Sequence, residues 1–217
     1  MRTLRAVHLV TFFLVHSAVW IGLSVALPGS DHVSYSDIGV DSTPWVRQFV
    51  LPLLIVLAVQ LLFVRRFGLR STVWRDATPT SRRFLLVFPL LMMMGSLGVV
   101  LTQGLSRAPV SYWVGITCTM VLVGLTEELS FRGILLVGGR QVWGSERKAL
   151  ITSSLLFGLF HLPNVITGQA LGPTVRQVVI TTFLGMVFYC LRRVTTRLWP
   201  AVVLHGIYDF VLIQSAF

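Results

Sequence analysis

The sequence predicts an all-α protein, a polytopic bundle of about seven membrane-spanning helices. Of its 217 residues, 54% are hydrophobic and only 12% are charged, and the mean hydropathy is +0.79. The apolar residues form long runs, which short basic clusters separate. An ordinary soluble domain has neither feature, so the composition indicates a membrane protein.

Three spans are expected in the N-terminal part of the chain, residues 1–111, which contains no diagnostic motif. They cover residues 6–27, 45–64 and 84–105. Ser24-Val-Ala26 resembles the cleavage site of a signal peptide. The apolar run before it is longer than the usual h-region of roughly 7–15 residues, so we expect this run to remain as the first span. An acidic loop at 28–44 follows it.

Four further spans are expected in residues 112–217. They cover residues 112–139, 149–166, 174–191 and 198–217. The second of these four contains Pro163, which breaks a helix. That span is therefore either short or kinked and continued toward residue 166.

The basic residues predict how the chain is oriented. The formal net charge is +10, but the basic residues lie between apolar runs and not along one amphipathic face, which argues against a nucleic acid partner. With the N-terminus in the cytoplasm, fourteen of the 18 Lys and Arg residues fall inside, and only Arg47, Arg107 and Arg176 fall outside. This follows the positive-inside rule. It predicts a multi-pass protein of the inner or plasma membrane with its C-terminus outside.

The fourth predicted span carries ionisable residues that are costly at such a depth. Glu128 and Arg132 are four residues apart, in the order that favours an ion pair on a helix. Glu127 points about 100° away and needs another partner. Intramembrane ionisable groups are by default a functional hypothesis.

Two other spans bring polar side chains to a similar depth. His161 and Glu127 each lie thirteen residues from cytoplasmic basic residues, or roughly 20 Å along a helix. His205 and Asp209 share a face of the last span, about 12 and 18 Å from its basic start. Phe157 lies one turn before His161. For a single histidine, an interhelical hydrogen bond is the simpler explanation. So many ionisable groups at one depth in the membrane favour a functional site instead.

The residue types limit the chemistry of such a site. Ser130 has no histidine beside it, and both cysteines lie away from the cluster, so a serine triad or a thiol nucleophile has little support. A carboxylate and an imidazole that act on water remain, with or without a metal. A buried glutamate is suited to be the general base.

Three motifs in order resemble the CPBP family of intramembrane proteases. They are Glu127-Glu128-x-x-x-Arg132, followed by Gly133, then Phe157-x-x-x-His161 and His205-x-x-x-Asp209. That family includes the type II CAAX prenyl endopeptidases and the bacterial Abi-type, lysostaphin-resistance-like proteins. The resemblance covers about residues 112–217 and implies a catalytic core in the last four helices.

The resemblance also implies roles for these residues. Glu127 and His161 would activate the attacking water, His205 and Asp209 would stabilise the oxyanion, and Glu128 would pair with Arg132. An ionised Asp209 cannot donate to an oxyanion, so it is either protonated or holds His205 as an imidazolium, and we favour the second role. A zinc ion on His161, His205 and a carboxylate is the alternative. We favour a site without metal or other cofactor.

The function expected from this resemblance is hydrolysis of a peptide bond in a membrane-anchored, CAAX-like or other, peptide or protein. The competing hypotheses are a carrier coupled to ions or protons, which would use the same Glu and His residues as a relay, and a non-catalytic relative of the proteases. Carriers often show paired repeats, whereas the intramembrane charges of this chain all lie in its second half.

Overall fold

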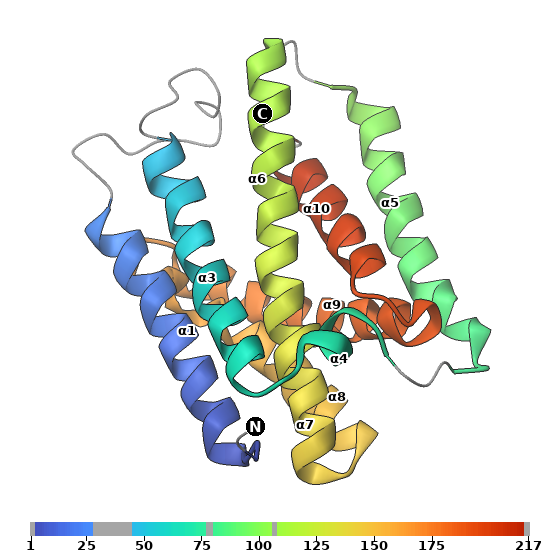
Figure 1. Cartoon of the computed structure of the whole chain (residues 1–217). Helices are drawn as coiled ribbons and strands as arrows, with labels where there is room; N and C mark the ends of the chain where they lie inside the picture. Colours follow the sequence, from blue (N-terminus) through green and yellow to red (C-terminus); the bar gives the residue numbers. More distant parts are fainter. Residues whose placement is uncertain (1–2, 28–44, 77–79, 106–107, 215–217) are drawn as a thin grey trace.

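The computed structural model describes residues 3–27, 45–76, 80–105 and 108–214 (Figure 1). Over these ranges the chain is helical and contains no strand, which confirms the predicted all-α bundle. The predicted acidic loop at 28–44, together with Arg2 and Arg107, lies outside the described residues. The elements are α1 (Ala6–Ala26), η2 (Val46–Val50), α3 (Leu51–Arg66), α4 (Arg70–Trp74), η3 (Arg83–Leu86), α5 (Val87–Gln103), α6 (Val110–Glu128), η4 (Leu129–Leu135), α7 (Leu136–Trp143), α8 (Glu146–Leu159), η5 (Leu162–Val165), α9 (Leu171–Thr195) and α10 (Trp199–Gln214).

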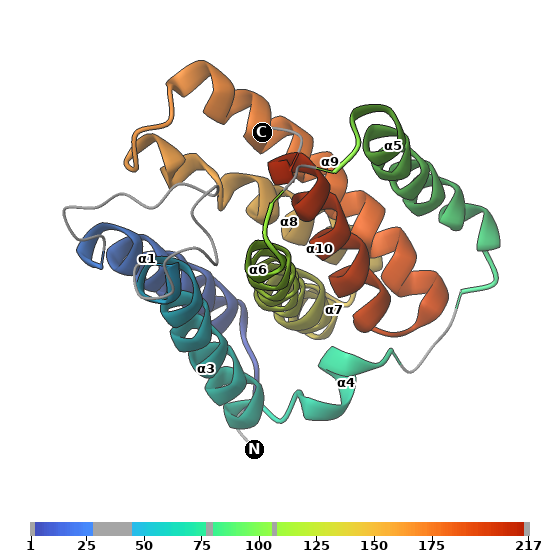
Figure 2. The same cartoon turned by 90° about the horizontal axis from the view of Figure 1, so that it is seen from above.

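One continuous helical rod, made of α6, η4 and α7, runs through the centre of the bundle. In both views α1 and α3 lie on one side of it and α10 and α5 on the other, while α8 and α9 pass behind it in Figure 1 (Figures 1 and 2). Pro109 precedes the rod, and Gly144, with φ of 59°, ends it in the left-handed conformation. The middle segment, η4, is π-helical, and such segments are frequent at functional sites.

Within the described ranges, four helical segments are long and apolar enough to cross a membrane. They are Ala6–Leu23, Val46–Arg66, Arg83–Gln103 and Leu171–Thr195, which correspond to the first, second, third and sixth predicted spans. The other three predicted spans contain the motif residues. Of these, α8 has only 14 residues and α10 only 16. Several apolar helices therefore support a multi-pass membrane protein, and the three shorter or more polar elements carry the candidate site.

The helix α8 ends early, as the proline in its predicted span suggested. It stops at Leu159, and the 3₁₀ turn η5 begins at Leu162 with Pro163 in its first turn. His161 lies at the junction of these two elements. The short form of this span is thus the observed one, and it puts His161 at a helix end inside the bundle.

Close contact between α6 and α10 brings the first and third motifs together. A Cβ atom on Gly124 would come within 2.7 Å of the Val202 carbonyl oxygen, and one on Gly206 within 3.1 Å of the Met120 carbonyl oxygen. Small residues let two helix backbones approach closely in membranes. Glu128, one turn after Gly124, and His205, the residue before Gly206, therefore come within hydrogen-bonding distance.

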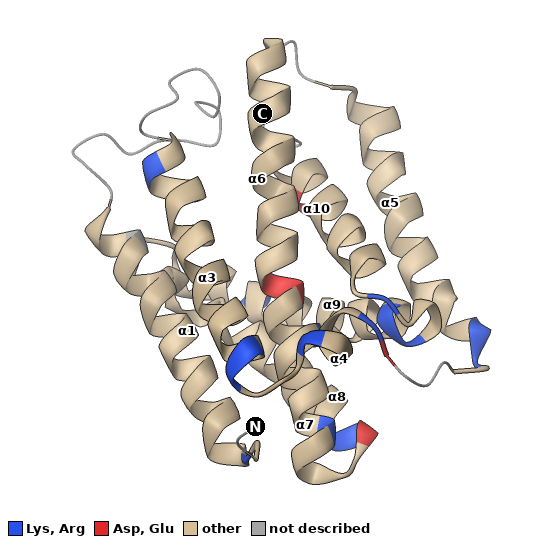
Figure 3. Cartoon of the chain, viewed as in Figure 1, with Lys and Arg blue, Asp and Glu red and all other residues tan. Residues whose placement is uncertain are grey.

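The basic residues gather at one end of the bundle, where α4 and the turn between α7 and α8 lie (Figure 3). We call this end the arginine-rich end. The chain after α4 is joined to the turn between α9 and α10 there, because Asp76 N–H donates to the Thr196 carbonyl at 2.7 Å and Leu198 N–H to the Trp74 carbonyl at 3.1 Å. The start of α1 lies at the same end (Figure 1).

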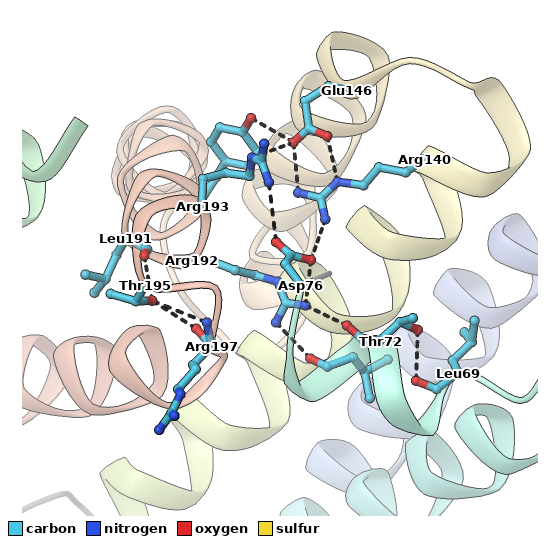
Figure 4. Close-up of polar contacts among 12 residues, drawn as sticks. Leu69, Thr72, Asp76, Arg140, Glu146, Leu191, Arg192, Arg193, Thr195 and Arg197 are labelled. Carbon is cyan, nitrogen blue, oxygen red and sulfur yellow. Dashed lines mark hydrogen bonds and ion pairs between the residues drawn. The ribbon is translucent and has the colours of Figure 1, made fainter. Parts of the chain in front are cut away.

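Two carboxylates bind three arginines at this end, in what we call the peripheral cluster (Figure 4). Asp76 contacts Arg140 at 2.7 Å, Arg192 at 3.3 Å and Arg193 at 3.8 Å. Glu146 contacts Arg140 at 2.8 Å and Arg193 at 3.4 Å, and it accepts a hydrogen bond from the Tyr189 hydroxyl at 2.8 Å. The cluster joins the segment after α4 to α7, α8 and α9.

Candidate active site

The residues of the first and third motifs form one buried cluster of charges between α6 and α10. We call it the central cluster, and it consists of Glu127, Glu128, Arg132, His205 and Asp209. Glu128 is its hub, because one carboxylate oxygen lies 3.0 Å from Arg132 Nε and the other 2.9 Å from His205 Nδ1. The ion pair predicted from the spacing of Glu128 and Arg132 is therefore present. Both side chains are almost completely buried, at 0% and 1% exposure.

Two aromatic rings cover the guanidinium of Arg132. Its Cζ lies 4.1 Å from the ring centre of Phe157 and 4.9 Å from that of Phe188. An arginine over an aromatic face gains a cation–π interaction, which is stronger away from water. Phe157 thus links the second motif to the first, and Arg132 is held by Glu128 on one side and by rings on the other.

His205 lies among three carboxylates. Its Nδ1 is 2.9 Å from Glu128, while its Nε2 is 3.3 Å from Asp209 and 3.7 Å from Glu127. The ring of Phe188 stacks on it at 4.7 Å. A neutral imidazole has only one N–H, so contacts with carboxylates at both nitrogens are satisfied together only by the doubly protonated ring.

Glu127 is the carboxylate with the loosest contact in the cluster. Three carboxylates face two cationic groups, Arg132 and a protonated His205. Glu127 Oε2 is buried and accepts no hydrogen bond from the described residues, and its contact with His205 is the longest of the three. The charge balance therefore leaves Glu127 as the carboxylate that lacks a full counter-charge.

His161 faces the same space with one ring nitrogen available. Its Nδ1 lies 3.0 Å from the Phe157 carbonyl oxygen, so an Nδ1–H would donate there and leave Nε2 as an acceptor. Its ring makes an edge contact with Phe157 at 5.4 Å. His161 and Glu127 thus present a free nitrogen and a free carboxylate oxygen.

Two cavities of about 290 Å³ each meet at these residues. Glu127, His161 and Asp209 line both. One cavity extends between α9 and α10, where Arg176, Gln177 and Tyr208 lie, and also reaches His205. The other extends toward α1 and α3, with Trp20 and Leu53 on its wall, and Asn164 and Gln177 add polar groups to its lining. A peptide segment and a water molecule fit in such a space.

Several residues of the site had no signal in the sequence. Phe188 and Gln177 lie on α9, whose predicted span contains no motif residue. For Glu128 the sequence predicted only the pair with Arg132. Its hydrogen bond with His205 was not predicted, because it joins residues 77 positions apart. Gln60 on α3 donates to the Thr126 carbonyl and to Ser130 Oγ, both at 2.9 Å, and so braces the rod beside the motif. A glutamine in an otherwise apolar run was the one available hint.

The alternative of a zinc ion requires three ligand atoms that face one point. In the described ranges, no group of three His, Cys, Asp or Glu side chains is placed to hold a metal. A His₂Glu set needs a free nitrogen from both histidines. Both nitrogens of His205 face carboxylates, which leaves only His161 Nε2, so the residues do not fit the ion in this arrangement.

The sequence comparison agrees with the motifs. Residues 109–211 match the family described as Type II CAAX prenyl endopeptidase Rce1-like. The matched region begins just before α6, ends within α10 and contains every residue of the three motifs. No curated protein and no solved structure matches the chain. The match confirms the resemblance to CPBP and CAAX proteases and supports, in general terms, a membrane-embedded endopeptidase.

Proposed function

We propose that this chain, whose residues 109–211 match the Rce1-like family, is an intramembrane endopeptidase in which Glu127 and His161 activate a water molecule. One observation carries this proposal. Glu127 is the single member of the central cluster without a full counter-charge, and it shares two cavities with the free nitrogen of His161. An ionised carboxylate in that position is a general base.

The proposed reaction begins with a water molecule between Glu127 and His161. Glu127 takes a proton from it while the oxygen attacks the carbonyl carbon of the scissile peptide bond. The oxyanion that forms accepts a hydrogen bond from Nε2–H of the protonated His205, which leaves its 3.3 Å contact with Asp209 for this purpose, while Nδ1–H keeps its bond to Glu128. Glu127 then returns the proton to the leaving nitrogen, the C–N bond breaks, and a carboxylic acid and an amine result.

The remaining members of the cluster position these groups. Asp209, 3.3 Å from His205 Nε2, favours the imidazolium and does not contact the oxyanion itself. Glu128 holds His205 from the other side and is itself held by Arg132. We assign no metal to this mechanism, because the geometry offers the free nitrogen of His161 but not of His205.

The substrate that suits this site is a membrane-anchored peptide or protein. The family name points to prenylated CAAX proteins, and the cavity toward α1 and α3, whose wall includes the apolar side chains of Trp20 and Leu53, is suited to a peptide that arrives within the bilayer. We further propose that the arginine-rich end faces the cytoplasm, as the positive-inside rule requires. Alkaline phosphatase fused after the last residue should then be active, and a phosphatase fused within the turn between α7 and α8 inactive. The reverse pattern would contradict this orientation.

The test of the proposed reaction is peptide cleavage by the purified full chain in detergent. Wild type should cleave a membrane-anchored peptide, Glu127→Gln should not, and a chelator should have no effect. Cleavage that survives Glu127→Gln contradicts the proposal. Loss of cleavage on addition of chelator would instead favour the zinc alternative. A carrier would cleave nothing and would show Glu127-dependent transport.

A further inference from the structure

A groove between α1 and α3, outside the candidate active site, has the features of a lipid-binding site. Its volume is about 800 Å³, and its lining comes from the first half of α1 and from the last turns of α3 with Phe67. Its floor is aromatic, since Phe12 and Phe63 approach each other at 4.7 Å and Phe63 and Phe67 at 4.6 Å. Val15 and Leu62 form its rim and are exposed at 45% and 65%. Both helices are candidate membrane spans, so the groove opens toward lipid.

The end of this groove at the arginine-rich end is basic. Arg65 and Arg66, in the last turn of α3, are part of its lining. Arg66 lies 5.9 Å from the ring centre of Phe67, and neither guanidinium is paired with a carboxylate of the described ranges. His8 lies at the same end, where its Nδ1 accepts the Arg5 backbone N–H at 3.0 Å. Its Nε2 is then left as a donor.

The apolar and basic parts together match a phospholipid. From Val15 to His8 the groove extends about 10 Å along α1, at 1.5 Å per residue, which is long enough for the upper part of an acyl chain. A phosphate at its end would meet two arginines and a histidine donor. Arginine is well suited to phosphate, because its planar group donates several hydrogen bonds.

We propose that the groove between α1 and α3 binds one anionic phospholipid from the leaflet next to the arginine-rich end. Its phosphate contacts Arg65 and Arg66, and one acyl chain lies along Phe12 and Phe63. This site does not depend on the proposed peptidase activity, because none of its residues belongs to the central cluster. It makes the packing of α1 against α3 sensitive to lipid composition.

The test is native mass spectrometry of the purified full chain in detergent. Dioleoylphosphatidylglycerol and dioleoylphosphatidylcholine are the two probes, titrated separately. Wild type should bind one phosphatidylglycerol at least about tenfold more tightly than phosphatidylcholine. Changing both Arg65→Gln and Arg66→Gln should weaken phosphatidylglycerol binding by about 30-fold, at the usual contribution of each basic residue near a membrane surface.

Two further variants separate a built site from general attraction to basic protein. Arg82→Gln with Arg83→Gln removes an exposed arginine pair that does not line the groove, and it should leave phosphatidylglycerol binding unchanged. Leu62→Trp fills the groove from its exposed rim, keeps both arginines and should weaken binding of both lipids. If the two arginine pairs have equal effects, or if wild type binds both lipids equally, the proposal is wrong. If the Arg65 and Arg66 variant does not fold, unchanged binding in Leu62→Trp overturns the proposal and weakened binding supports it.

Discussion

The protein contains two clusters of carboxylates and cations that differ in how fully their charges are matched. In the peripheral cluster, Asp76 and Glu146 each contact at least two arginines, so cations outnumber carboxylates. In the central cluster three carboxylates face Arg132 and His205, and Glu127 keeps only a 3.7 Å contact. A carboxylate surrounded by cations stabilises the fold. A carboxylate that lacks a counter-charge beside a cavity is available for chemistry.

This comparison predicts that the two clusters respond in opposite ways to loss of a carboxylate. In the central cluster, Glu127→Gln should lower kcat/KM for peptide cleavage by about 10²–10⁴-fold, the usual contribution of a general base. Its thermal unfolding temperature should not fall, since the change removes an unmatched charge. Kinetics and thermal unfolding on the same preparation check both parts. A variant that is much less stable than wild type would place Glu127 among the structural residues.

In the peripheral cluster, Asp76→Asn should destabilise the protein without changing its chemistry. Asp76 is 8% exposed, and Arg192, one of its partners, is 0% exposed. Removal of one member of a buried ion pair leaves the other charge uncompensated and costs about 3–5 kcal/mol. Unfolding in denaturant should show this loss, while kcat per folded molecule stays near the wild-type value. A folded and stable variant with low kcat would mean that the clusters are coupled.

Within the central cluster, Asp209→Asn removes the carboxylate that faces Nε2 of His205. Loss of a hydrogen bond to a charged group should lower kcat by roughly tenfold and leave KM nearly unchanged. The amide oxygen of the substituted side chain could still accept from His205, so the effect should stay well below that of Glu127→Gln. Steady-state kinetics of the two variants, measured together, test this order. An effect of Asp209→Asn as large as that of Glu127→Gln would assign Asp209 the role of base.

The smallest effect is expected from Glu146→Gln at the edge of the peripheral cluster. Burial works against ionisation of Glu146, but hydrogen bonds from Arg140 and Tyr189 outweigh it and hold the pKa of this carboxyl below its ordinary 4.5. A lowered folded-state pKa contributes stability above about 4.5, and this stability is lost as the pH falls through the folded value. Glu146 is 41% exposed, so water screens the effect. The variant should melt a few degrees below wild type at pH 7, and this difference should be clearly smaller at pH 3, well below 4.5. An equal difference at both pH values would contradict this assignment.

Local spacing predicted those parts of the structure that depend on one helix. The Glu128–Arg132 pair, the shared face of His205 and Asp209, and the break before Pro163 all follow from distances of a few residues. Local spacing does not predict contacts between helices, because these contacts depend on how closely two backbones approach. The hydrogen bond from His205 to Glu128 requires Gly124 and Gly206 to meet the opposite helix, and nothing in the pattern of either span specifies that partner.

The peripheral cluster was missed for a different reason. Asp76 follows a short helix in a segment that reads as an arginine-rich connection, and its partners lie 64 and 116 residues further on. Charged residues in a connection usually remain in water, so the sequence offered no reason to bury this one. The π-helical segment η4 also has no signature in the residues that form it.

The length of the central rod separates the surroundings of the two clusters. Its three segments contain 19, 7 and 8 residues and rise about 50 Å in total, whereas the hydrocarbon layer of a bilayer is only about 30 Å thick. The rod is thus longer than the layer is thick, and we expect its charged end, the turn after α7 with Arg140 and Glu146, to lie in the aqueous phase. Dissolved salt reaches these residues and shields them over about 8 Å at physiological concentration, but it does not reach Glu127. The ion pairs that join the α7–α8 turn to its neighbours should thus weaken as the ionic strength rises. The electrostatic surroundings of Glu127, at the centre of the bundle, should stay constant.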